Sequence, residues 1–142
     1  GVATLHCLPK TAWPSDFAQT VKAIAEAEAY HGPSLVICYA PCINHGIRGG
    51  MSIAQTEIKR AVEAGYWHMF RFDPRKTLAG ENPFQLDSPE PDTDKLMDFL
   101  MGENRFASLK NNFPEKADAL YAKEIADVKA RYAKYKKMAA DN

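Results

Sequence analysis

The stretch SLVICYA, residues 34–40, is an almost unbroken apolar run with β-branched and aromatic members. Such a run is typical of a strand that is covered on both faces, as in a parallel sheet. A loop of polar and glycine residues follows it at 41–46 (PCINHG). The run therefore predicts a buried strand that ends in a loop.

A helical pattern precedes this strand at residues 16–30. Asp16 and Gln19 have the spacing of a capping box, which places the start of the helix at Asp16. Apolar residues recur at helical spacing and predict one apolar stripe. The stripe consists of Phe17, Val21 and Ile24.

A second helical pattern follows the loop at residues 52–64. Ser52 and Gln55 again have the form of a capping box, and Gly65 is a suitable residue just past the helix end. The aromatic run at 66–72 is the next predicted strand. The predicted buried stripe consists of Ala54, Ile58, Ala61 and Val62.

The two helical patterns connect three strand patterns, at residues 2–5, 34–40 and 66–72. Strand–helix–strand units with short turns imply right-handed crossovers and parallel strands. We therefore expect an α/β fold with a short parallel sheet flanked by helices.

The chain changes character after Asp73. Residues 74–92 are rich in proline and acidic side chains, which predicts a loop without regular structure that wraps a surface or serves a site. Residues 93–142 carry helical patterns, the last of which starts at Pro114. We thus expect three segments: an α/β core at 1–73, the acidic loop at 74–92 and a helical C-terminal tail at 93–142.

The last helix carries an apolar seam with alternating spacings of four and three residues. We expect this seam to dock on the α/β core of a larger protein or across a subunit boundary, and to drive homo-oligomer formation by the isolated chain. The alternative is packing on the first helix of the same chain. The seam consists of Tyr121, Ile125, Val128, Tyr132 and Tyr135.

Composition argues against several classes of protein. The 142 residues are 46% hydrophobic and 25% charged, which is typical of a globular domain. Eighteen basic residues balance eighteen acidic ones, so we expect no nucleic-acid or membrane partner. Three cysteines argue against a disulfide framework and favour a reducing, cytoplasmic compartment.

Cys42 is the main candidate for chemistry, because open α/β sheets place their ligands in the loops that follow the strands. The alternative is a small buried hydrophobe, the usual role of a free cysteine. Alternation along the strand is expected to point Cys38 into the core. His45 is a candidate general base or ligand, with a plain hydrogen-bonding role as the commoner alternative. His68 is expected to be packed, and Cys7 receives no role.

Longer stretches of the sequence resemble the pyruvate:ferredoxin (flavodoxin) oxidoreductase family, in the C-terminal part of its thiamine-diphosphate domain. They are residues 25–47 (AEAEAYHGPSLVICYAPCINHGI), 49–67 (GGMSIAQTEIKRAVEAGYW), 70–75 (FRFDPR) and 81–91 (ENPFQLDSPEP). The block YAPCINHG at 39–46 is the most specific part. Residues 1–15 depart from the family, around Trp13.

This resemblance implies a partial thiamine-diphosphate-binding fold and the oxidative decarboxylation of pyruvate to acetyl-coenzyme A. It implies [4Fe–4S] clusters, thiamine diphosphate and Mg²⁺ as cofactors of the longer enzyme, and ferredoxin or flavodoxin as electron acceptor. Cys42 matches the fourth cysteine of the cluster nearest the thiamine. The other three cysteines and the diphosphate-binding element are expected upstream, so the isolated chain is expected to hold no cofactor and to be inactive.

The resemblance thus predicts a C-terminal piece of a longer oxidoreductase, whose first partner is the upstream part of the same enzyme. An alternative from another class is a small stand-alone α/β interaction module without catalysis. A third is an assembly subunit that completes a site on a partner chain. Iron and sulfide content after co-expression with the upstream segment would distinguish these possibilities.

Overall fold

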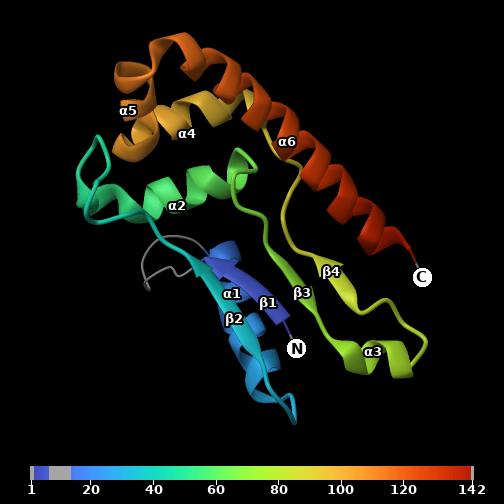
Figure 1. The fold of residues 1–142 in the computed structure, drawn as a ribbon. Helices are drawn as coiled ribbons and strands as arrows, with labels where there is room; N and C mark the ends of the chain where they lie inside the picture. The colour runs from blue at the N-terminus through green and yellow to red at the C-terminus, as the bar shows by residue number, and fades with distance from the viewer. Residues whose placement is uncertain (1, 7–13, 142) are drawn as a thin grey trace. The chain divides into compact units, whose positions relative to one another are not determined.

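The computed structural model describes residues 2–6 and 14–141 of the protein (Figure 1). They form two compact units. The first comprises Gly1–Tyr39, His68–Ser88 and Ala133–Asn142, and the second comprises Ala40–Trp67 and Pro89–Tyr132. Cys7 and Trp13 lie outside the described residues, and the division into segments 1–73, 74–92 and 93–142 stays a prediction.

The first unit is built on a four-stranded sheet with the order β2-β1-β3-β4. Strands β1 (Val2–His6) and β2 (Leu35–Tyr39) run parallel to each other. Strand β3 (Phe70–Phe72) runs antiparallel to β1, and β4 (Phe84–Leu86) runs antiparallel to β3. The α/β class is confirmed, and so is a strand at the start of the chain.

The expectation of a parallel sheet is wrong, because the sheet is mixed and two of its three strand pairs are antiparallel. Residues 40–67, which include the second predicted helix, belong to the second unit. Because β1 is parallel to β2 and antiparallel to β3, the chain does not return parallel to β2 after these residues. The aromatic strand is also shorter than expected, since β3 begins only at Phe70.

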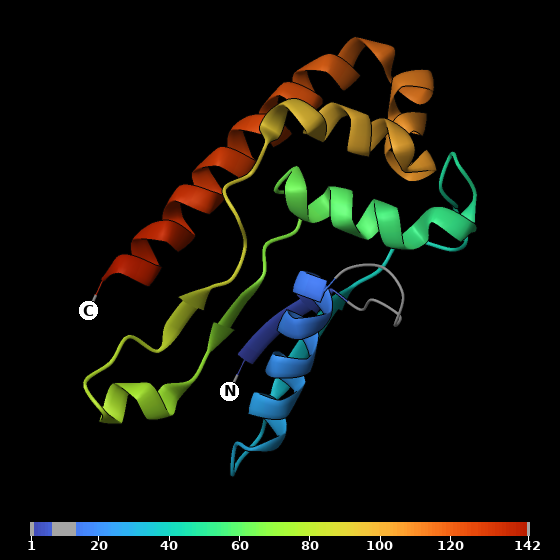
Figure 2. The ribbon, with the colours of Figure 1, turned by 180° about the vertical axis from the view of Figure 1, so that it is seen from behind.

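Helix α1 (Pro14–Glu28) packs against β1 and β2, behind them in Figure 1 and in front of them in Figure 2. It begins two residues before Asp16, so the capping box expected at Asp16 is wrong. Ala23 is completely buried, whereas Val21 and Ile24 are 47% and 50% exposed. Ala23 therefore faces inward, whereas Val21 and Ile24 of the predicted apolar stripe are about half exposed.

Strand β2 is not buried, contrary to expectation. Leu35, Val36 and Ile37 are all exposed, Cys38 is exposed as well, and only Tyr39 of this strand is buried. β2 lies at the end of the strand order, with β1 as its single neighbour among the described strands. The prediction that Cys38 points into the core is therefore wrong.

Helix α2 (Ala54–Glu63) lies in the second unit and follows a 3₁₀ turn, η1, at Met51–Ile53. Ser52 lies inside that turn and does not cap the helix, so the second predicted capping box is also wrong. The predicted buried face is confirmed for three of its four members, Ile58, Ala61 and Val62. Gly65 follows the helix end with a φ of 75°, as its glycine predicted.

The helices predicted after residue 93 are confirmed, but the prediction of a loop without regular structure at residues 74–92 is wrong. Segment 74–92 contains both a short helix and strand β4, whose backbone pairs with β3 in the sheet. Within the described residues, no helix has the length and apolar character needed to cross a bilayer. The remaining elements are α3 (Pro74–Leu78), η2 (Thr93–Lys95), α4 (Leu96–Gly102), α5 (Asn104–Asn112) and α6 (Pro114–Ala140).

The apolar seam of α6 packs on its own chain. In the second unit, Val128 is completely buried and the Tyr121 hydroxyl donates to the Phe106 carbonyl oxygen over 2.9 Å. In the first unit, the Tyr135 ring lies 5.3 Å from Phe70 and 6.0 Å from Phe84, centroid to centroid. Members of the seam thus pack on other parts of the same chain: Tyr121 bonds to the backbone of α5, and Tyr135 contacts aromatic side chains of β3 and β4.

Candidate functional site

Cys42 and His45 form a close side-chain pair in the loop that follows β2. The Cys42 Sγ atom lies 3.1 Å from His45 Nδ1. Cys42 is only half-buried and His45 is exposed, so the interpretation of Cys42 as a small core hydrophobe is not supported. The Gly46 N–H donates to the Cys42 carbonyl oxygen over 2.9 Å and closes the turn that carries both side chains.

The loop is fixed to the start of α5. The Asn104 side-chain amide donates to the His45 carbonyl oxygen over 2.8 Å. The Asn104 backbone N–H donates to the Gly46 carbonyl oxygen over 3.3 Å, and Ile47 forms an antiparallel bridge with Glu103. Asn104 is a site residue that the sequence did not reveal, because 59 residues separate it from His45 and no local pattern connects them.

The environment of Cys42 favours its thiolate. The hydrogen bond with the His45 side chain, followed by the backbone N–H groups of His45 and Asn44, lowers the pKa of Cys42 from 9.0 to about 7. A thiolate is the form of cysteine that binds metals and attacks electrophiles. Cys42 is therefore prepared for either kind of chemistry at neutral pH.

Cys42 fits the role of one ligand of a cluster, but the described residues around it do not provide a complete set of ligands. Within the part of the chain that the structure describes, no group of three or more His, Cys, Asp or Glu side chains could hold a metal ion. A [4Fe–4S] cluster is held by about four thiolates. The other described cysteine, Cys38, lies on β2 in the first unit. Cys42 thus supplies a single accessible thiolate, and its role as a cluster ligand stays a prediction.

Curated relatives match nearly the whole chain. It is 52% identical over 132 residues to the pyruvate-flavodoxin oxidoreductase of Klebsiella pneumoniae, which covers 93% of this chain and 11% of that protein. It is 57% identical over 121 residues to the pyruvate:ferredoxin oxidoreductase of Moorella thermoacetica, which covers 85% of this chain and 10% of that protein. The chain belongs to the pyruvate:ferredoxin (flavodoxin) oxidoreductase family.

The oxidoreductase chain spans about a tenth of the length of these relatives. It is also 46% identical over 123 residues to the mitochondrial pyruvate dehydrogenase [NADP(+)] of Euglena gracilis, which covers 87% of this chain and 7% of that protein. No protein-family model matches the chain. The relatives favour a segment of a large oxidoreductase over a stand-alone interaction module.

A second feature of this oxidoreductase segment, which the sequence did not reveal, is the buried carboxyl group of Glu57 on α2. Its side chain is completely buried, and its Oε2 atom accepts from Arg60 over 3.2 Å. Its Oε1 atom is buried without a hydrogen-bond partner, and a Cβ atom on Gly102 would lie 2.4 Å from it. Burial raises the pKa of Glu57, and the charge of Glu103 adds to this rise.

Glu57 lines an open hollow of about 370 Å³ in the second unit, together with Arg48, Arg60 and Asp98. The charges around this hollow are of both signs. It therefore offers neither a plain anion site nor a plain cation site.

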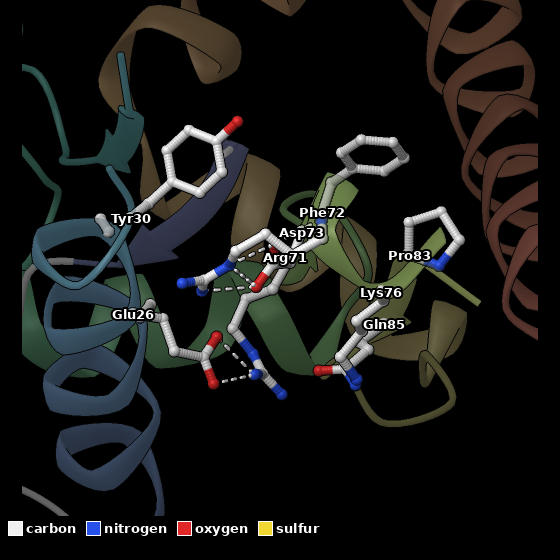
Figure 3. A pocket seen from close by; sticks show the side chains of 11 residues that line it. Glu26, Tyr30, Arg71, Phe72, Asp73, Lys76, Pro83 and Gln85 are labelled. Carbon is white, nitrogen blue, oxygen red and sulfur yellow. Dashed lines mark hydrogen bonds and ion pairs between the residues drawn. The ribbon is translucent and has the colours of Figure 1, made fainter. Parts of the chain in front are cut away.

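A third feature of the oxidoreductase segment is a cavity of about 160 Å³ in the first unit, shown in Figure 3. Its main cation, Arg71, contacts both Glu26 oxygens over 2.7 Å and forms two hydrogen bonds with Asp87, over 2.7 and 2.8 Å. Arg75 is likewise paired with Asp73 over 2.7 Å. Because these guanidinium groups already face carboxylates, the network serves to join α1 to the sheet and not to bind an anion.

Proposed function

We propose that this chain is the part of a pyruvate:ferredoxin (flavodoxin) oxidoreductase that supplies one cysteine ligand, Cys42, to a [4Fe–4S] cluster. The cluster, when bound, transfers single electrons, and the remaining ligands come from the rest of the enzyme. The observation that carries this proposal is the accessible Cys42 thiol, held on a fixed loop with its thiolate favoured near neutral pH.

The names of the relatives support the wider reaction. They identify pyruvate as substrate and flavodoxin or ferredoxin as electron acceptor of those proteins. We propose the same substrate and acceptors for the enzyme that contains this chain, with thiamine diphosphate, Mg²⁺ and coenzyme A bound outside the described residues. The exposed apolar side chains of β2 agree with this, because a longer polypeptide can cover them.

The decisive experiment replaces Cys42 by serine in the full-length enzyme. A hydroxyl is a poor ligand for the iron of a cluster, so Cys42→Ser should lose one cluster, about four iron atoms per chain, and the matching electron-paramagnetic signal. Cys38→Ser is the matched control, because Cys38 is also a free cysteine but lies in β2. Unchanged iron content and spectra in Cys42→Ser would refute the ligand assignment.

The proposal also predicts the behaviour of the isolated 142-residue chain. A [4Fe–4S] cluster is held by about four thiolates, and we propose that this chain supplies one of them. The chain alone should therefore show no pyruvate-dependent reduction of a dye. The assay requires a preparation free of full-length enzyme. Turnover by such a preparation would contradict the proposal that catalysis needs the rest of the polypeptide.

A further inference from the structure

His45 makes a specific contact with the proposed ligand atom. Its Nδ1 atom lies 3.1 Å from Cys42 Sγ, within the range of a hydrogen bond to sulfur. A sulfur that binds iron carries no proton, so it can only accept. The contact is then attractive only if Nδ1 of His45 carries the hydrogen and donates it to the sulfur.

The backbone that carries this imidazole is held from two directions. The Gly46 N–H bond to the Cys42 carbonyl closes the turn, and Gly46 allows it with a φ of 74°. The Asn104 side chain fixes the His45 carbonyl from the start of α5. The backbone of His45 is therefore fixed, and its Nδ1 atom lies within hydrogen-bond range of the sulfur, as expected for a group that orients and polarises a metal ligand.

We propose that His45 is a positioning residue that donates a hydrogen bond from Nδ1 to the Cys42 sulfur and thereby raises the reduction potential of the cluster that Cys42 binds. Hydrogen bonds to sulfur are one of the means by which a protein sets the potential of such a cluster. The reduced cluster carries one more negative charge than the oxidised one. A donor aimed at its ligand sulfur therefore stabilises the reduced form more. This inference rests on the proposed function.

The test is a redox titration of the full-length enzyme, followed by electron paramagnetic resonance. The signal to follow is the one that Cys42→Ser removes. In His45→Ala, the iron content should be unchanged and the midpoint potential of this cluster should move to more negative values. In His45→Asn, the amide Nδ2 can take the place of the imidazole Nδ1, so most of the shift should be restored. His31→Ala, at an exposed histidine of the first unit, should leave the potential unchanged.

An unchanged potential in His45→Ala would overturn the inference while leaving Cys42 as a ligand. Loss of the cluster in both His45→Ala and His45→Asn would also overturn it, because His45 would then be needed for binding and not for the potential. Loss in His45→Ala alone, with a normal cluster and potential in His45→Asn, would support the donor role. Retention of the cluster in Cys42→Ser would instead refute the proposed function on which the inference rests.

Discussion

Gly65 is a position where one added methyl group should cost both backbone strain and crowding. The residue lies just past the end of α2, with a φ of 75° in the left-handed region. A Cβ atom placed there would lie 2.5 Å from Pro91 Cβ and 2.8 Å from Val128 Cγ1. The left-handed conformation costs about 1–2 kcal/mol for a residue with a Cβ. Crowding of a packed site costs a further ~1–3 kcal/mol. Gly65→Ala should therefore lower the free energy of unfolding by about 2–5 kcal/mol.

Gly46→Ala is the matched control for this prediction. Gly46 has nearly the same φ, 74°, and lies in the same unit, but the nearest atom to its added Cβ would be Asn104 Nδ2 at 3.5 Å, an ordinary contact. It should lose only about 1–2 kcal/mol. Urea unfolding of both variants, followed by circular dichroism, measures the difference. Equal losses would show that Pro91 and Val128 do not crowd this position.

Three further predictions concern the ionisable groups. With the other cysteines replaced by serine, the rate at which iodoacetamide alkylates Cys42 should reach half its maximum near pH 7, because the pKa is lowered to about 7, and His45→Ala should move this midpoint upward. Since burial raises the pKa of Glu57, stability is greatest while this carboxyl is protonated and falls as the pH rises through its folded pKa. Glu57→Gln should thus raise the urea midpoint more at pH 8 than at pH 4.5. Arg71→Ala, which removes the cation that pairs with the part-buried Asp87 carboxylate, should cost roughly 3–5 kcal/mol in urea unfolding, and Arg71→Lys should cost less.

The sequence predicted the elements well where local signals decide them. The end of α2 at Gly65 and the start of α6 at Pro114 follow from the backbone preferences of glycine and proline. Capping boxes were less informative, because Ser52 lies in a 3₁₀ turn and Asp16 lies inside α1. A side chain with the right spacing caps a helix only if the chain turns into the helix at that residue, and the spacing does not specify this.

The direction of the strands depends on long-range pairing that no local pattern contains. Residues 66–72 have strand propensity, but only Phe70–Phe72 pair, and they pair antiparallel to β1. Likewise, the sequence singled out Cys42 and His45 separately, as two residues of one loop. Their contact, and the support from Asn104, arise only when the loop is fixed to the start of α5.

The apolar run SLVICYA predicts burial, but most of the strand that it forms is exposed. Leu35, Val36 and Ile37 are 54%, 36% and 40% exposed, although such a run is typical of a strand covered on both faces. A pattern of this kind reflects the burial of the strand in the protein in which it functions. The chain spans about a tenth of the length of its relatives, so a longer polypeptide would offer further surface to cover β2. The same reasoning applies to Cys42, which follows this strand. Among the described residues no group of three or more His, Cys, Asp or Glu side chains could hold a metal ion, which agrees with the proposal that the rest of a longer polypeptide completes the site of Cys42.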